Sequence, residues 1–187
     1  MRWTAARNPD VLAIGVDANA DGLRETSRRL AAKPARGGLA NAMLGRLSLQ
    51  DAPGELAGMA DRLTVLLPWG SLLRAVALPD EPALRALRAL CKPDAQARFL
   101  FGYGPQTDGA VIDELALPSL DVPAAGLTLE ACYRRAGLAV RARAVQLDEV
   151  RELPTTWAGR LAFSGHRRSF IELRGRAHSS LAAYVES

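Results

Sequence analysis

The sequence predicts an α/β fold with a mostly parallel sheet and an antiparallel strand near the C-terminus. Apolar runs of strand length alternate with amphipathic stretches along the chain, the pattern of helices packed on a sheet. The first run, Val11–Val16, ends at Asp17, and an acid at the tip of a buried strand is typical of doubly wound nucleotide-binding folds. The last two runs, Val140–Leu147 and Ser169–Arg174, are expected to form the antiparallel pair.

The N-terminal elements follow from apolar spacing and from two prolines. Pro9 ends the first helix, and Pro34 ends a second one that carries leucine and alanine at helical spacing. In order, we expect the end of a helix at Met1–Asn8, a strand at Val11–Val16, a helix at 20–33, a flexible basic loop at 35–41 and a strand at Asn41–Leu47.

The elements that follow are placed by the same signals. The apolar run before PWGS predicts a strong strand. The helix expected at Ala83–Leu90 is stopped by Lys92-Pro93. Thr128 is the expected N-cap of the later helix, with Glu130 in its first turn and Gly137 as its C-terminal cap. The expected elements are helices at Gly54–Asp61, Ala83–Leu90 and Thr128–Ala136, and strands at Leu63–Leu67 and Ala97–Gly102.

The composition is that of one globular domain, expected over residues 1–187. Hydrophobic residues make up 49% and charged residues 24%, so disorder is not indicated. No apolar run approaches the roughly 20 residues of a membrane span, and the N-terminus has no signal-peptide core. The two cysteines, Cys91 and Cys132, suggest neither a zinc site nor a disulfide, which fits a cytoplasmic protein.

Arginine-rich segments indicate a polyanion as partner. Residues 23–50 carry six cations against one acid, whereas residues 104–133 carry five acids and no lysine or arginine. A basic face of this kind suits nucleic acid. The alternative is an arginine-rich surface that contacts only solvent.

Three segments could carry chemistry, and each has a structural alternative. Asp17, followed by Ala18 and Asn19, can accept both hydroxyls of a ribose at the sheet edge, or can simply form a turn or helix cap. Trp69, in the strand exit TVLLPWGSLL, can stack on a base while Gly70 lets a ligand approach the backbone. Alternatively, Trp69 packs in the core.

The third segment, TTWAGRLAFSGHRRSF, joins an aromatic residue to a cluster of cations. Trp157 offers a stacking surface, and Arg160, Arg167 and Arg168 offer guanidinium groups that suit phosphate. The alternative is a surface loop. The histidines and cysteines show no metal-ligand spacing, and no Ser-His-Asp or Cys-His arrangement is recognisable.

Three stretches resemble the aminoglycoside-resistance 16S ribosomal RNA methyltransferases that modify N1 of a decoding-site adenosine. These stretches are GVDANADGLRETSRRLAAKPARGGLANA, ADRLTVLLPWGSLLRAV and TTWAGRLAFSGHRRSFIELRG. The resemblance implies a class I, Rossmann-like fold dependent on S-adenosylmethionine. It also implies 16S rRNA in the small ribosomal subunit as partner, no membrane, and a monomer.

The resemblance also assigns roles to residues. Asp17 would bind the cofactor ribose, and Trp69 and Trp157 would sandwich the flipped adenosine beside Arg160. The other residues assigned to the cofactor are Ala18, Asn19, Leu49, Gln50, Leu67 and Thr155. The residues assigned to RNA binding are Arg28, Arg29, Lys33, Arg36, Arg167 and Arg168.

Two departures from the family pattern affect the expected activity. Gln50 stands where the family has a glutamate, and the sequence opens within a helix, downstream of the expected first strand and its glycine-rich cofactor loop. We therefore expect an N-terminally truncated fold, with an in-frame extension encoded before Met1. The alternatives to a methyltransferase acting on rRNA are a relative that binds rRNA without methyl transfer and a methyltransferase acting on a small molecule.

Overall fold

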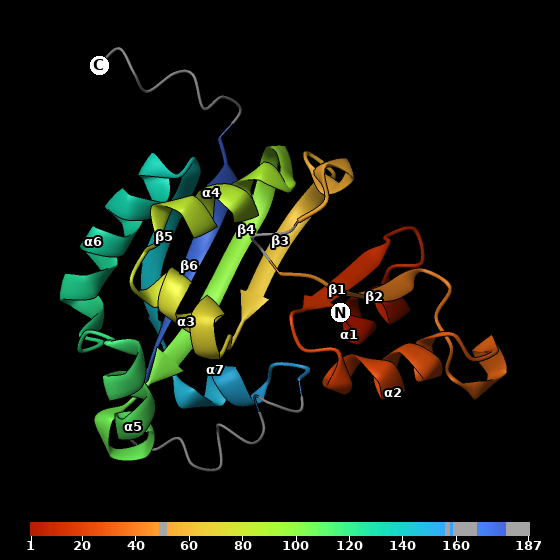
Figure 1. Cartoon of the computed structure of the whole chain (residues 1–187), viewed down its shortest axis with the longest axis horizontal. Coiled ribbons are helices and arrows are strands. Elements are labelled where there is room, and N and C mark those ends of the chain that lie inside the picture. The colour runs from red at the N-terminus through yellow and green to blue at the C-terminus, as the bar shows by residue number, and fades with distance from the viewer. Residues whose placement is uncertain (49–51, 156–157, 159–167, 179–187) are drawn as a thin grey trace. The chain divides into compact units, whose positions relative to one another are not determined.

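The computed structural model describes residues 1–48, 52–155, 158 and 168–178 (Figure 1). Contacts divide the chain into two compact units, Met1–Ala52 and Pro53–Ser187, which are described separately. The single domain expected over residues 1–187 remains a prediction. No helix in the described ranges is long and apolar enough to cross a membrane.

The first unit is a small α/β arrangement around two parallel strands. Its elements are α1 (Arg2–Arg7), β1 (Ala13–Asp17), α2 (Asp21–Leu30), the 3-10 turn η1 (Pro34–Arg36) and β2 (Ala42–Arg46). The register runs from Ala13 opposite Ala42 to Asp17 opposite Arg46, and α2 packs on β2. The Asn41 side-chain amide donates to the carbonyls of Ala5, Asn8 and Val11, each at 3.0 Å, and so fastens α1 and the start of β1 to β2.

The basic segment after α2 is a defined turn, although it was expected as a flexible loop. Gly37 adopts a φ of +80°, which favours glycine. A Cβ on Gly38 would lie 1.6 Å from the Ala32 carbonyl oxygen, so no larger residue fits there. The Leu39 amide donates to the Leu30 carbonyl at 2.9 Å. The two glycines therefore return the chain closely onto the end of α2.

The second unit is a four-stranded mixed sheet in the order β3-β4-β6-β5. β3 runs parallel to β4, and β6 is antiparallel to both β4 and β5, which confirms the antiparallel strand expected near the C-terminus. Its strands are β3 (Ala60–Leu66), β4 (Cys91–Tyr103), β5 (Leu138–Val145) and β6 (Ser169–Ala177). Its helices are η3 (Gly54–Leu56), α3 (Gly70–Ala77), α4 (Glu81–Ala89), α5 (Pro105–Leu115), α6 (Val122–Arg135) and α7 (Leu147–Arg151).

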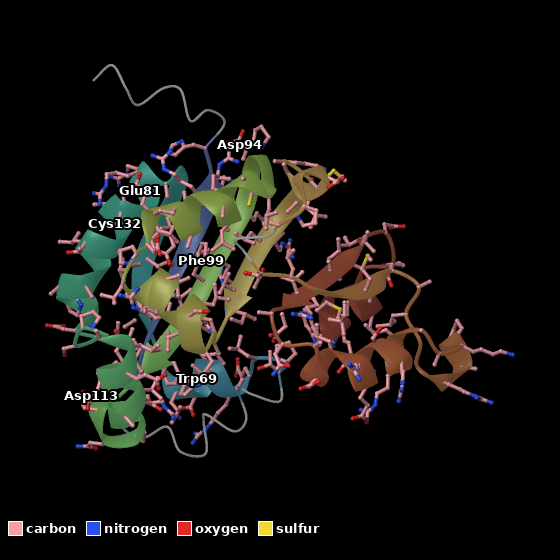
Figure 2. All side chains as sticks on the ribbon, viewed as in Figure 1. Trp69, Glu81, Asp94, Phe99, Asp113 and Cys132 are labelled. Atoms are coloured by element: carbon pink, nitrogen blue, oxygen red, sulfur yellow. The ribbon has the colours of Figure 1, made fainter. Side chains whose placement is uncertain are left out.

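The main core lies between the sheet and the helices α3, α4 and α6, which cover one of its faces (Figure 1). Phe99, in the middle of this sheet (Figure 2), meets the edge of Tyr133 from α6 at 4.9 Å between ring centroids. The Tyr133 hydroxyl donates to the Val76 carbonyl at 3.1 Å, which satisfies the one polar atom of a fully buried ring. This core fixes the strands of the sheet, and with them the carboxyl end of β3, where Trp69 lies.

Several element boundaries differ from the sequence expectation. Thr128 is not an N-cap, because the helix begins at Val122 with Asp121 as N-cap and a proline in its first turn. β4 begins at Cys91 and continues through Pro93, because a register shift opposite Ala60 and Arg62 accommodates the proline.

Other differences from the sequence expectation concern helices. The helix expected at Gly54–Asp61 is only a 3-10 turn, and its last residues belong to β3. α3 and α5 were not expected. Leu147 begins α7 rather than ending a strand, because Gln146 and Glu149 form a reciprocal capping box there.

The second unit is expected to lose stability in acid because of two buried carboxylates. Burial raises the pKa of Glu172, but hydrogen bonds from Arg143 and Arg98 outweigh it and leave that pKa below its ordinary value. Asp108 likewise has a lowered pKa. A carboxyl whose pKa is lower when folded contributes stability above its unfolded pKa of about 4, and loses it as the pH falls through the folded value.

Urea denaturation between pH 7 and pH 2.5 tests this expectation. The free energy of unfolding should fall with pH in the unaltered chain and fall less steeply in Glu172→Gln. The exposed Glu114→Gln serves as control and should keep the original slope. Equal slopes for the unaltered chain and Glu172→Gln would contradict the role given to Glu172.

Candidate functional site

Asp17 forms a shaped acidic turn where β1 leads into α2. Its Oδ1 accepts a hydrogen bond from the Asn19 amide at 2.9 Å, and Asn19 Oδ1 accepts one from the Asp21 amide at 2.9 Å. Asp17 is exposed, and within the described residues its second carboxylate oxygen accepts no hydrogen bond. Asp17 therefore forms the turn that was the alternative to ribose binding, and its second carboxylate oxygen is still available to a hydroxyl donor.

The end of β3 has an unusual backbone. Leu67 has a φ of 50°, a left-handed conformation that non-glycine residues rarely adopt. Its amide donates to the Leu100 carbonyl at 2.7 Å. Its side chain is buried in a cluster with Leu100, Val145, Val150, Ala158 and Phe170. The side chain of Leu67 is therefore part of the core, and only its backbone is left to face a ligand.

Trp69 lies just beyond this turn at the start of α3 (Figure 2). It is 47% exposed, so the alternative that it packs in the core is wrong. Gly70 follows with a φ of 57°, a conformation that favours glycine at this turn. The strained backbone of Leu67 and the glycine at 70 together turn the chain so that a large aromatic side chain stands at the carboxyl edge of the sheet.

Of the third candidate segment, only Thr155, Ala158 and residues 168–170 belong to the described residues. Thr155 Oγ1 accepts a hydrogen bond from the Ala158 amide at 2.9 Å, as the side chain of an N-cap residue does. Its hydroxyl hydrogen can still be donated to another group. The predicted site residues Leu49, Gln50, Trp157, Arg160 and Arg167 lie outside the described residues.

Arg168 has an internal role that its sequence context did not predict. Its guanidinium donates to both carboxylate oxygens of Asp108, at 2.6 and 2.7 Å, and the two side chains are 8% and 3% exposed. Burial raises the pKa of Asp108, but hydrogen bonds from Arg168, the Gly104 amide and Thr107 outweigh this and lower it. The pair fastens the start of α5 to the start of β6, and this geometry does not favour the RNA contact predicted for Arg168.

The cations predicted to bind RNA in the first unit are exposed on α2 and on the turn after it. Arg29 forms an ion pair with Glu25 one helical turn earlier. Lys33 is the N-cap of η1, and Arg36 is its last residue. Arg28 lines an open hollow with two arginines, Arg24 and Arg46, that were counted in the basic segment but not named as site residues. No group of metal-ligating side chains occurs in the described part of the chain.

A family model described as NpmA, 16S rRNA (adenine(1408)-N(1))-methyltransferase, matches residues 2–176. A 16S rRNA (adenine(1408)-N(1))-methyltransferase from Escherichia coli is 30% identical over 179 residues, covering 91% of this chain and 78% of the relative. The enzyme of the same name from Streptoalloteichus hindustanus is 34% identical over 176 residues, covering 92% of this chain and 79% of the relative.

Solved structures agree with these sequence matches. The crystal structure of the aminoglycoside resistance methyltransferase NpmB1 has a TM-score of 0.78 and 37% identity, covering 94% of this chain and 80% of that one. A mutant of the 16S rRNA (adenine(1408)-N(1))-methyltransferase from Catenulisporales acidiphilia, crystallised with cosubstrate SAM, has a TM-score of 0.77 and 33% identity. That match covers 95% of this chain and 80% of the other.

Proposed function

This chain belongs to the 16S rRNA (adenine(1408)-N(1))-methyltransferase family, and we propose that it transfers a methyl group from S-adenosylmethionine to N1 of a decoding-site adenosine in 16S rRNA. Methylation there would confer aminoglycoside resistance, the activity named for NpmB1. The observation that carries the proposal is the family match over residues 2–176. The exposed Trp69, which follows the end of β3, supports it.

The residues of the first unit suit part of the cofactor. S-adenosylmethionine supplies a methyl group already activated on a sulfonium sulfur. Asp17 would accept the ribose hydroxyls, since its exposed carboxylate keeps an oxygen free within the described residues. Ala18 and Asn19 would hold the turn that aims this carboxylate, and Leu49 and Gln50 would lie near the adenine.

The residues of the second unit would position the base that accepts the methyl group. Trp69 would stack on the flipped adenosine opposite Trp157, beside Arg160, and the backbone at Leu67 with Thr155 would border the methyl group. Adenine N1 carries its own lone pair, so the chain need supply no nucleophile or base. Its contribution is orientation. The positive charge of the sulfonium passes with the methyl group to the adenine, which can release its N6 proton to water afterwards.

The basic residues of the first unit would bind the RNA backbone. Arg28, Arg29, Lys33 and Arg36 are exposed and suit phosphate oxygens, with Arg167 as a further contact. The substrate would be the assembled small subunit rather than naked RNA, recognised by a monomer in the cytoplasm.

Incubation of purified small ribosomal subunits with the chain and methyl-labelled S-adenosylmethionine tests the proposal. We expect label in 16S rRNA and a primer-extension stop at the modified adenosine, because N1 lies on the Watson–Crick edge. Asp17→Asn should raise the KM for the cofactor about tenfold or more, the loss of a charge-assisted hydrogen bond pair. The exposed Asp10→Asn is the control and should leave this KM unchanged.

The outcomes separate the candidate functions. Label that enters rRNA at another nucleotide would keep the methyltransferase and overturn its target. Subunit binding without any label, together with no detectable cofactor binding by calorimetry, would favour a protein that binds rRNA without methyl transfer.

A further inference from the structure

An open hollow of about 310 Å³ lies on the first unit, between α2 and β2. Its polar lining consists of Arg24, Ser27 and Arg28 from α2 and Arg46 from β2. Its apolar part consists of Ala20, Leu23 and Leu44. Arg24 and Arg28 stand one helical turn apart, with Ser27 between them on the same side of the helix. Arg46 is the last residue of β2, so the strand delivers a third guanidinium to the same place.

The charge around the hollow is strongly unbalanced. Among the described residues, neither Arg24, Arg28 nor Arg46 forms an ion pair, whereas their neighbour Arg29 is paired with Glu25. Asp17 is the register partner of Arg46, but its Oδ1 accepts from the Asn19 amide and no ion pair joins the two side chains. Three like charges that line one hollow repel each other, and a bound anion would relieve this repulsion.

We propose that Arg24, Arg28 and Arg46, with the Ser27 hydroxyl, bind one phosphate group of the rRNA backbone. Guanidinium forks match the geometry of phosphate oxygens, and a hydroxyl adds a further donor. The exposed, open hollow admits a phosphate that is part of a chain, whereas an enclosed cavity would not. This inference rests on the proposed function for its RNA source, and it adds Arg24 and Arg46 to the RNA-binding residues.

Binding of the full chain to small ribosomal subunits, measured at several KCl concentrations, tests the inference. The variants of the hollow are Arg24→Gln, Arg46→Gln and the double variant. A lost phosphate contact should lower the slope of log K against log salt by about 0.7–1 and weaken binding about five- to tenfold at ~0.1 M salt. Arg85→Gln, which removes an equally charged but ion-paired arginine from α4, is the control and should keep the original slope.

Two further measurements make the outcome decisive. Arg46→Lys keeps the charge and should restore part of the affinity, and thermal melting checks that each variant is folded. Unchanged affinity and slope in the folded double variant would overturn the inference, while methylation of subunits by the unaltered chain would leave the proposed function standing. If the hollow binds inorganic phosphate but the double variant keeps its affinity for subunits, the claim that the bound phosphate belongs to rRNA is wrong.

If the unaltered chain fails to methylate subunits, phosphate binding in the hollow can still be tested. The same variants are titrated with a short single-stranded RNA oligonucleotide at several salt concentrations. A lower slope of log K against log salt in the double variant supports phosphate binding in the hollow. An unchanged slope there overturns it.

Discussion

Trp69→Ala is expected to lower methyl transfer to small ribosomal subunits by about 100-fold or more while leaving the melting temperature nearly unchanged. Stacking of a base on an aromatic side chain is worth ~1–3 kcal/mol, and misplacing a reacting group by about an ångström costs a further factor on the order of 100. Trp69 is 47% exposed, so its loss removes little buried surface, whereas a buried tryptophan would cost ~3–5 kcal/mol of stability. Methyl incorporation and thermal melting on one preparation measure both effects.

Trp3→Ala provides a matched control for this experiment. Trp3 is also 47% exposed, and it stacks under Arg7 within α1 at 4.3 Å from the ring centroid. Its removal should leave methyl transfer intact. Trp69→Phe should keep part of the activity because a smaller ring still stacks, and Trp157→Ala should resemble Trp69→Ala. If Trp69→Ala keeps full activity, or if it unfolds the protein, the proposed base sandwich is wrong.

The largest loss of stability is expected from Asp108→Ala, about 3–5 kcal/mol in the free energy of unfolding. Removing one partner of a buried ion pair leaves the other charge without its counterion in a medium that solvates it poorly. Arg168, whose side chain is only 8% exposed, would lose the carboxylate with which it pairs. The Gly104 amide, which donates to Asp108 Oδ2 at 3.0 Å, would lose its acceptor as well.

Urea denaturation of four variants measures this loss in the free energy of unfolding. Asp113→Ala, at an exposed position of the same helix (Figure 2), should change stability by no more than about 0.5 kcal/mol. The double variant Asp108→Ala/Arg168→Met should be less destabilised than the sum of the two single variants, because it leaves no unpaired charge. Additive losses would mean that the two side chains contribute independently.

Local patterns in the sequence were sufficient for much of the fold and for the family, while the roles given to the site residues remain predictions. Apolar runs placed β1 and β3. The expectation that the first strand is buried was wrong, because Ala13 is the only buried residue within β1, and Ile14 and Val16 are exposed. The acid at the tip of the first strand and the tryptophan in PWGS were both found from short stretches, and both lie where the chain leaves a strand. The resemblance carried by these stretches agrees with the family match over residues 2–176.

Only the tertiary structure decided which distant residues meet. Asp108 and Arg168 are 60 positions apart, and they pair because β6 enters the sheet between β4 and β5, which brings its first residues to the start of α5. Arg24 and Arg46 converge because α2 packs back on β2, although the sequence showed them only as members of a basic segment. Strand order and helix packing are set by the sum of many weak contacts across the whole core, so no local spacing encodes them.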